Sequence, residues 1–246
     1  MSYKIAVEVK NLSKNFLLAN NQSLSILKNI SMKAEYGEFI SILGVSGSGK
    51  STLLKCMSSL LVPSSGSVEI NSVNPYKLRN NKLAKLRRED ISFIFQSYNL
   101  VPALPVVENI LLPFRLSHKR IQIEKIEKLL EQMNFNADIH SFVGTLSGGE
   151  KQKVTIARAI LTDSNIIFAD EPTGALDSSS RQIIFDLLRD LANQGKCIVM
   201  VTHDIELASY TDRALILKDG EIDTEFYKPS AEDLYVALET NLNQKL

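Results

Sequence analysis

The sequence predicts an α/β fold in which a mostly parallel sheet is covered by helices. Short, continuously apolar runs recur along the chain, and such runs are typical of strands buried on both faces of a parallel sheet. Helical patterns, with apolar residues three and four positions apart, lie between these runs. The apolar runs lie at 38–43, 91–96, 166–170, 197–202 and 214–219, and the helical patterns at 120–133, 151–161 and 179–195.

The remaining elements complete one predicted domain over residues 1–246. Residues 7–12 and 26–34 alternate partly between apolar and polar, as in the half-buried strands of an N-terminal antiparallel subdomain. Asp219 and Gly220 form a hairpin turn signal, and Ser230 begins an amphipathic pattern that predicts a C-terminal helix over 230–244. Residues 97–162 are mostly helical and are predicted to be a helical subdomain inserted in the core, which comprises 1–96 and 163–228.

Composition excludes several classes of protein. Lys plus Arg and Asp plus Glu both number 28, so a formal net charge of zero provides no general attraction to nucleic acid. The first thirty residues show no signal peptide, and the longest uncharged run, 91–107, is too short and too broken by polar residues to span a bilayer. We therefore expect a soluble chain, in which Cys56 and Cys197 are reduced, buried thiols.

A glycine-rich loop follows the apolar run 38–43. The sequence "GVSGSGKS", from Gly44 to Ser51, has the spacing G-x-x-x-x-G-K-[ST] between a predicted strand and a predicted helix. Glycines allow successive N–H groups to point inward, and the start of the following helix adds positive potential. The loop therefore predicts a P-loop that binds nucleotide phosphates, with Lys50 on the β- and γ-phosphates and the Ser51 hydroxyl on Mg²⁺.

Two carboxylates end the apolar run 166–170. At the carboxyl end of a strand beside the loop, Asp170 is placed to hold Mg²⁺. Glu171 is placed to polarise an attacking water. Two further polar residues end neighbouring strands, namely Gln96, whose amide oxygen is a candidate Mg²⁺ ligand, and His203.

A second glycine-rich helix start occurs at "LSGGE". Ser147 is a natural N-cap, and Glu150, three residues later, completes a capping box. Gly148 and Gly149 expose backbone N–H groups at the same helix start. The chain thus has two helix starts suited to phosphate, and one nucleotide triphosphate needs both only if they meet around it.

Together these elements, in this order, resemble the ATP-binding subunit of an ABC transporter from about residue 5 to residue 225. The pairing of "LSGG" with "FADEPTGALD" is far more specific than the phosphate loop alone. The resemblance implies an ATPase that uses ATP and Mg²⁺, with Glu171 as base and with His203 and Lys50 at the γ-phosphate. It implies metal contacts from Ser51, Gln96 and Asp170, and ATP contacts from Phe16, Gly44, Val45, Ser46, Gly47, Ser48, Gly49, Lys50, Ser51, Thr52 and Gln96.

The family resemblance also implies a head-to-tail pair of ATP-binding domains. Each ATP then lies between the glycine loop of one domain and the signature helix of the other, so the signature Ser147, Gly148, Gly149 and Glu150 faces the partner's ATP. Asp177 falls in the dimer loop of the family. The expected partners are a second copy of the chain and a separate membrane permease, with the chain bound to the cytoplasmic face of the membrane.

Three positions depart from the usual family pattern. Phe16 occupies the place of an adenine-stacking aromatic that is often Tyr, and a plain core role for it stays open. Glu150 stands where Gln is commoner. Lys153 replaces Arg and loses forked hydrogen bonding, so a helix–phosphate or interdomain contact is expected to be weaker.

Residues 96–116 and "GALD" resemble one branch of the family, which contains lipoprotein-release, macrolide-export, cell-division and antimicrobial-peptide-resistance ATPases. We expect export of, or resistance to, antimicrobial peptides or related amphiphiles. A cell-division or lipoprotein-release type of force transmission is the alternative. A ribosome- or DNA-directed ATPase is disfavoured because the chain carries a single motif set, no long coiled coil and no net charge.

Two segments are candidate partner surfaces. The apolar, proline-bearing stretch from Tyr98 to Pro113 is predicted to receive a coupling helix of the permease, with a role in the helical subdomain core as the alternative. The segment 77–88 holds six Lys or Arg and no acid. It is predicted to be a solvated helix face, with lipid headgroups as the alternative partner.

Overall fold

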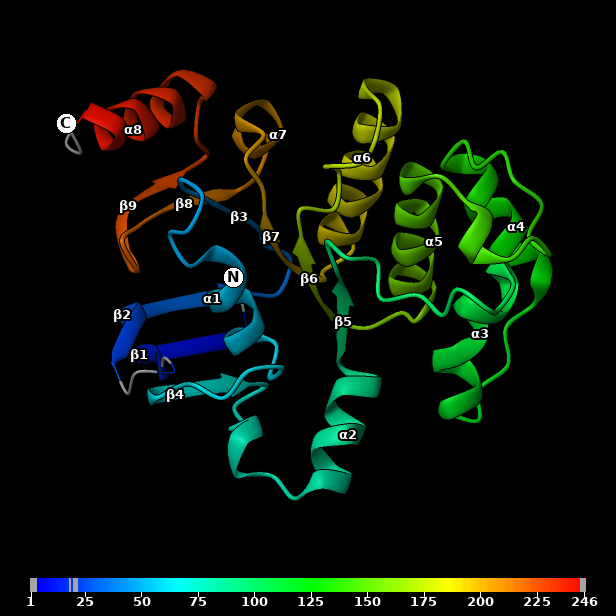
Figure 1. Ribbon diagram of the computed structural model, residues 1–246, viewed down its shortest axis with the longest axis horizontal. Helices are drawn as coiled ribbons and strands as arrows, with labels where there is room; N and C mark the ends of the chain where they lie inside the picture. The colour runs from blue at the N-terminus through cyan, green and yellow to red at the C-terminus, as the bar shows by residue number, and fades with distance from the viewer. Residues whose placement is uncertain (1–3, 18, 20–21, 244–246) are drawn as a thin grey trace.

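The computed structural model describes residues 4–17, 19 and 22–243 and confirms the predicted α/β class, with two sheets (Figure 1). The smaller sheet is antiparallel, has the order β2-β1-β4, and consists of β1 (Ile5–Leu17), β2 (Ser23–Glu35) and β4 (Ser65–Ile70). The larger sheet has the order β5-β6-β7-β3-β8-β9 and is parallel except for β9. Its strands are β3 (Phe39–Leu43), β5 (Ile91–Ile94), β6 (Ile166–Asp170), β7 (Cys197–Val201), β8 (Arg213–Lys218) and β9 (Glu221–Tyr227).

The three helices predicted from apolar periodicity are present, with adjusted ends. The helix predicted over 120–133 begins only at Ile123, and the predicted helix at 179–195 ends at Asn193, before Gly195. The α-helices are α1 (Lys50–Met57), α2 (Asn80–Glu89), α3 (Val106–Leu116), α4 (Ile123–Gln132), α5 (Gly148–Leu161), α6 (Ser178–Asn193), α7 (Ile205–Ser209) and α8 (Ala231–Asn243). Two short 3₁₀ turns, η1 (Pro75–Lys77) and η2 (Val143–Thr145), complete the elements.

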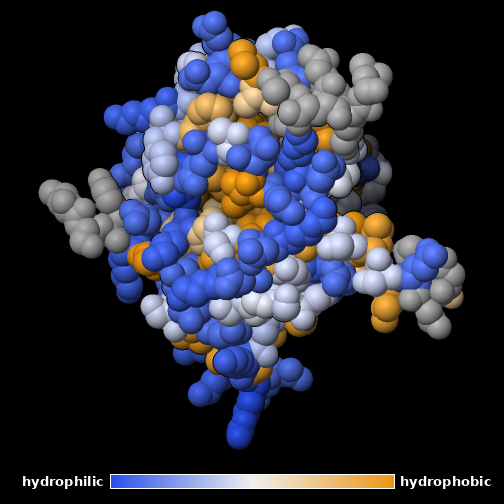
Figure 2. All heavy atoms as spheres, turned by 90° about the vertical axis from the view of Figure 1, so that its left-hand side faces the viewer, coloured by the Kyte–Doolittle hydropathy of each residue, from blue (hydrophilic) through white to orange (hydrophobic). Residues whose placement is uncertain are grey.

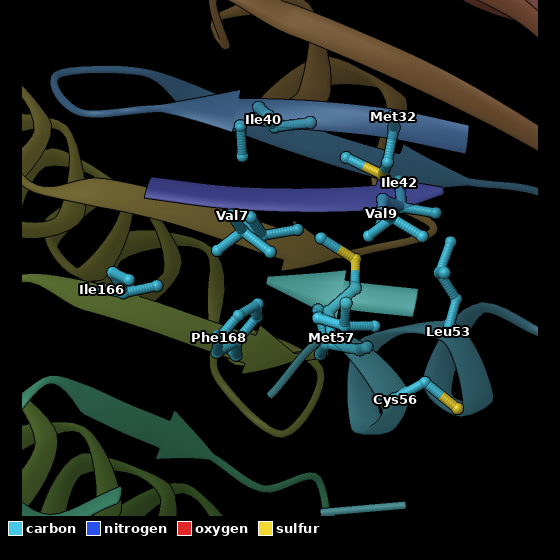
Figure 3. Packing of buried hydrophobic residues seen from close by; sticks show 14 of the residues in the cluster. Val7, Val9, Met32, Ile40, Ile42, Leu53, Cys56, Met57, Ile166 and Phe168 are labelled. Carbon is cyan, nitrogen blue, oxygen red and sulfur yellow. The ribbon is translucent and has the colours of Figure 1, made fainter. Parts of the chain in front are cut away.

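Helix α1 lies between the two sheets. Every residue of β3, β6 and β7 is buried, as expected for strands covered on both faces. Figure 3 shows Leu53 and Met57 of α1 packing in one cluster with Val9 of β1 and Phe168 of β6. This packing fixes the start of α1, and hence the glycine loop, at the carboxyl end of β3.

The other face of the large sheet packs against helices α3, α5 and α6. Val106, Val107 and Ile110 of α3 are buried in this second cluster, together with Leu130 of α4. For these three residues of the 98–113 stretch the alternative of a core role is therefore correct. A partner surface in this region has to use the residues that remain accessible.

The predicted C-terminal helix is present and packs against the core. Helix α8 begins after Ser230, whose Oγ accepts a hydrogen bond from the Asp233 N–H at 3.1 Å, and buries Leu234 against β8 and α7. Figure 2 shows the face that carries α8 and β9, where hydrophilic side chains predominate and hydrophobic ones gather in a hollow near the centre. Across residues 4–17, 19 and 22–243, none of the helices combines the length and the apolar character needed to cross a bilayer.

Candidate nucleotide site

The loop between β3 and α1 needs glycine at two positions for steric reasons. Gly44 has φ 151°, and a Cβ there would lie 2.2 Å from the carbonyl oxygen of Leu217. Gly49 has φ 104°, and its Cβ would lie 2.8 Å from Leu27 Cδ2. Gly49 is also the N-cap of α1 and supplies no side-chain cap, so the first N–H groups of the helix remain available for an anion.

Lys50 is held inside this loop before any phosphate arrives. Its Nζ donates to the carbonyl oxygens of Gly44, at 2.8 Å, and Val45, at 3.0 Å. Burial lowers the pKa of the Lys50 ammonium, and the charges of Glu171 and Asp170 oppose that shift. A partly desolvated cation whose protein acceptors are neutral carbonyls is well prepared for a phosphate oxygen.

The Ser48 hydroxyl adds a second sign of a phosphate seat. Ser48 is 3% exposed, and within the described part of the chain its Oγ has no hydrogen-bond partner. A buried hydroxyl without a partner costs free energy, so such groups in folded proteins usually have a water or ligand partner. A phosphate oxygen seated in the loop would satisfy it.

A pocket of about 490 Å³ joins the loop to residues from three other strand ends. The strand order β5-β6-β7-β3 brings the carboxyl ends of these strands to the same edge of the sheet. Sequence-predicted residues that are far apart in the chain therefore line one cavity. Its lining comprises Ile26, Gly44, Ser46, Gly47, Gly49, Lys50, Ser51, Thr52, Gln96, Glu171 and His203.

Glu171 is the centre of the polar contacts in this pocket. Its Oε2 lies 3.3 Å from His203 Nδ1 and accepts a hydrogen bond from Gln96 Nε2, also at 3.3 Å. The Glu171 backbone has φ 49°, and its N–H donates to the Val201 carbonyl at 3.0 Å. This bond holds residue 171 at the end of β7, and its carboxylate lines the same pocket as Lys50.

Ser51 and Asp170 form the candidate magnesium site. The Ser51 Oγ donates to Asp170 Oδ1 at 2.8 Å, and burial raises the pKa of the Asp170 carboxyl. A buried carboxylate beside a hydroxyl fits Mg²⁺, which takes few protein ligands and completes its shell with water and phosphate oxygens.

The signature residues do not line this pocket. Ser147 Oγ accepts from the Glu150 N–H at 3.3 Å, and Glu150 Oε2 accepts from the Ser147 N–H at 3.0 Å, so the predicted capping box is confirmed. A Cβ on Gly148 would lie 3.0 Å from the Tyr98 hydroxyl, and one on Gly149 would lie 3.2 Å from the Ala175 carbonyl. The capping box orders the start of α5 as a second glycine-rich helix start. It lies outside the pocket that the glycine loop of the same chain lines.

Asp177 and Lys153 both make contacts within the chain. Asp177 caps α6, where its carboxylate accepts from the Ser180 N–H at 2.9 Å and from the Ser179 hydroxyl at 2.7 Å. These hydrogen bonds, that from the Ser180 N–H foremost, hold the pKa of Asp177 well below its usual range. Lys153 Nζ donates to the Asn134 carbonyl at 2.8 Å, so it ties α5 to the end of α4.

Phe16 lies outside the pocket lining. It sits opposite Leu24 in the β1–β2 pair, is 39% exposed, and has the Lys14 ammonium 4.9 Å from its ring centre. Ile26, on β2, lines the pocket instead. The sequence did not reveal this role, because the partial alternation of apolar and polar residues in β2 does not show which face of the strand is turned toward the glycine loop. The exposed ring excludes the plain core role that had stayed open for Phe16, but its adenine contact stays a prediction.

Replacing Phe16 with alanine tests the adenine contact. If the ring stacks on adenine, the Kd for ATP should rise about tenfold, since aromatic stacking on a base contributes about 1–3 kcal/mol. The matched control is Leu17→Ala, because Leu17 is adjacent, apolar and 83% exposed. Isothermal titration with ATP measures both variants, and equal affinities for the two would remove Phe16 from the site.

Comparisons with known proteins agree with this geometry. The model of the family described as ABC transporter matches residues 27–174. Proteins named macrolide export ATP-binding/permease protein MacB are similar. The one from Campylobacter jejuni is 42% identical over 227 residues, which are 92% of this chain and 35% of the relative. The one from Bdellovibrio bacteriovorus is 39% identical over 219 residues, which are 89% of this chain and 34% of the relative.

The chain therefore spans about a third of the length of these relatives. Among solved structures, the dimeric structure of MJ0796, a bacterial ABC transporter cassette, has a TM-score of 0.85 and 36% identity. The alignment covers 91% of this chain and 99% of that one. The dimeric post-hydrolysis state of the same cassette, bound to ADP and Pi, matches equally well.

Proposed function

Because the chain belongs to the ABC transporter family of ATP-binding domains, we propose that two copies of it close around two ATP molecules and drive a membrane permease by hydrolysing them. One observation carries this proposal. The chain has two glycine-rich helix starts, and only the start of α1 borders the pocket that holds Glu171. The start of α5 is then available for the ATP of a second copy.

Hydrolysis would be an in-line attack of water on the γ-phosphate. The loop N–H groups, the Ser48 hydroxyl and Lys50 hold the phosphates, and Glu171 accepts the proton of the attacking water. His203, 3.3 Å from the Glu171 carboxylate, positions that water against the γ-phosphate. Mg²⁺, held by Ser51, Asp170 and Gln96, would supply neutralisation of the negative charge that develops on the phosphates.

The second copy would complete the site from the other side. Ser147 and the N–H groups of Gly148 and Gly149 would contact the γ-phosphate bound by the opposite loop. Asp177 would lie near the dimer axis while capping α6. Residues 97–162, which include α3, α4 and α5, would move as a helical subdomain against the core formed by 1–96 and 163–228.

Mixing two inactive variants tests the shared site. Lys50→Ala disables the loop and Ser147→Arg obstructs the signature, so each homodimer should be inactive. A random 1:1 mixture contains one intact site in each heterodimer and should recover up to about a quarter of wild-type ATPase activity. A phosphate-release assay measures the rates, with circular dichroism to verify folding. If the mixture stays inactive while both variants are folded, the proposal fails.

The names of the relatives indicate a permease as the further partner. Those proteins are named ATP-binding/permease proteins, and this chain aligns with about a third of their length. We therefore propose that a permease completes the transporter. The accessible part of the Tyr98–Pro113 stretch would contact it at the cytoplasmic face of the membrane. Leu104 and Pro105, which are half-buried, lie on this stretch.

The relatives' names favour export of a macrolide, and the resemblance of the sequence to antimicrobial-peptide-resistance ATPases supports a peptide as the other candidate cargo. Force transmission of the cell-division or lipoprotein-release type is the alternative function. In a reconstituted complex, ATP hydrolysis stimulated by erythromycin or by bacitracin would identify the cargo class. A rate that neither compound changes would favour the alternative.

A further inference from the structure

A small polar hollow adjoins the nucleotide pocket. It has a volume of about 110 Å³ and shares Glu171 and His203 with that pocket. Its remaining walls come from the loop before α6, from the first turn of α6, and from the segment between β7 and α7. They are Thr173, Gly174, Arg181, Thr202 and Asp204. Arg181 and Asp204 are charged, and neither of them lines the nucleotide pocket itself.

The position of His203 depends on the residues on either side of it in the chain. Its side chain is 69% exposed, so the ring is not fixed by packing, although its Nδ1 lies 3.3 Å from Glu171 Oε2. Thr202 is buried, and its N–H donates to the Ile42 carbonyl at 3.2 Å. The Asp204 N–H donates to Thr202 Oγ1 at 3.0 Å. Whatever fixes Asp204 therefore also limits where the imidazole can lie.

Both carboxylate oxygens of Asp204 accept hydrogen bonds. Oδ1 accepts from the Leu207 N–H at 3.1 Å and so caps α7. Oδ2 accepts from Arg181 Nη1 at 3.3 Å. The first bond is local to α7, whereas the second joins the segment to α6, which lies beside α7 (Figure 1). The contact with Arg181 thus fixes the segment that carries His203 against a second helix.

Arg181 is placed for this contact at a cost in stability. Its N–H donates to the Asp177 carbonyl at 2.9 Å, so it belongs to the capped first turn of α6. Its Nε is buried without a hydrogen-bond partner among the described residues, which is unfavourable. The side chains of Arg181 and Asp204 are 41% and 19% exposed, and ion pairs at such exposure contribute little stability. Stability therefore explains the position of Arg181 poorly.

We propose that Arg181 is a positioning residue for ATP hydrolysis, which acts by holding Asp204 against α6 and thereby keeps His203 beside the Glu171 carboxylate. This inference rests on the proposed function, since it concerns the water that Glu171 and His203 would orient. A small displacement of a group that orients a reactant lowers the rate strongly. Arg181 does not line the nucleotide pocket, so the affinity for ATP should not depend on it.

The same helix supplies a matched control in Arg189. Its Nη1 donates to Asp212 Oδ2 at 2.8 Å, so it also forms an ion pair between α6 and a segment next to α7. Neither Arg189 nor Asp212 lines the nucleotide pocket or the polar hollow. Replacing Arg189 with glutamine therefore removes the same charge and the same kind of contact, without affecting the segment that carries His203.

Kinetics of these variants test the proposal. Arg181→Gln is expected to lower kcat about tenfold, whereas the Kd for ATP should change by less than about twofold. Arg181→Lys should restore at least about half of the wild-type kcat, because the single contact to Asp204 Oδ2 needs only one charged donor. Arg189→Gln should keep kcat within about twofold of wild type. Phosphate release gives the rates, calorimetry gives the affinities, and circular dichroism verifies folding.

Nuclear magnetic resonance gives a readout of position that does not require hydrolysis. The chain has three histidines, so ¹³C-labelled histidine yields one ring signal for each of them. The His203 signal is identified as the one that disappears in His203→Gln. It should move or broaden in Arg181→Gln and return in Arg181→Lys. It should be unchanged in Arg189→Gln, and the signals of His118 and His140 should be unchanged throughout.

Three results would overturn the proposal. These are a His203 signal that is the same in Arg181→Gln and in wild type, a loss of kcat that Arg181→Lys does not restore, and an equal loss in Arg189→Gln. If wild type hydrolyses no ATP while the His203 signal still depends on Arg181, the proposed function fails and the positioning of His203 stands. Normal hydrolysis with a His203 signal that is indifferent to Arg181 refutes the positioning role alone.

Discussion

Replacing Glu171 with glutamine is expected to reduce ATP hydrolysis at least about 100-fold, while the Kd for ATP changes by less than about twofold. Glutamine keeps the size of the side chain and its contact with Gln96 but cannot accept the proton of the attacking water. The backbone of residue 171 should stay in place, because its N–H bonds the Val201 carbonyl and not a side chain. Phosphate release measures the rate, and titration calorimetry measures the affinity.

The same variant should accumulate as an ATP-bound dimer. Bound nucleotide that is not hydrolysed holds the two copies together, so light scattering should show twice the monomer mass with ATP and monomer with ADP. Glu206→Gln is the control, since Glu206 lies in α7, outside the lining of the pocket. Wild-type turnover in Glu171→Gln would contradict the assignment of the base, and a monomer under saturating ATP would contradict closure around the nucleotide.

Replacing Lys50 with alanine is expected to raise the Kd for ATP by about 10- to 100-fold, because a hydrogen bond to a charged group contributes about 1.5–3 kcal/mol. The effect should lie toward the upper end, since Lys50 is partly desolvated and its present acceptors, Gly44 and Val45, are neutral carbonyls. Calorimetry with ATP and with AMP shows whether the lost affinity comes from contact with the β- and γ-phosphates. AMP, which lacks the β- and γ-phosphates, should bind both proteins equally.

Lys55→Ala provides the matched control for this prediction. Lys55 lies five residues along the same helix, α1, and is exposed. Its removal changes the net charge by the same amount but leaves the glycine loop intact. If both alanine variants weakened ATP binding equally, general electrostatic attraction would explain the loss of affinity. The prediction that Lys50 contacts the phosphates directly would then be wrong.

Local interactions account for what could be predicted about the two helix starts. The spacing of Gly44, Gly49, Lys50 and Ser51 between a strand and a helix is a local pattern, although the atoms that a Cβ would meet at the two glycines belong to distant strands. Ser147 and Glu150 bond each other across three residues, so their capping box follows from spacing alone. The class of fold was equally predictable, since continuous apolar runs indicate parallel strands that are buried on both faces.

Long-range packing explains what was not predictable. The burial of Val106, Val107 and Ile110 depends on where α3 docks, and an apolar run by itself does not distinguish a core face from a partner surface. The position of Ile26 depends on how the small sheet sits over the glycine loop. The basic segment 77–88 is exposed or half-buried at all six of its Lys and Arg residues, and only the packing of α2 beside β5 decides which of them border a hollow, namely Arg87 and Arg88.

The sequence by itself determined the fold class, the glycine loop and the capped start of α5, because each depends on residues that are neighbours along the chain. Only the tertiary structure brought Gln96 and His203 within 3.3 Å of the Glu171 carboxylate, through the strand order β5-β6-β7. The physical reason is that the free energy of these arrangements comes from burying sheet and helix faces against each other, and the order in which strands pair is a property of the whole core.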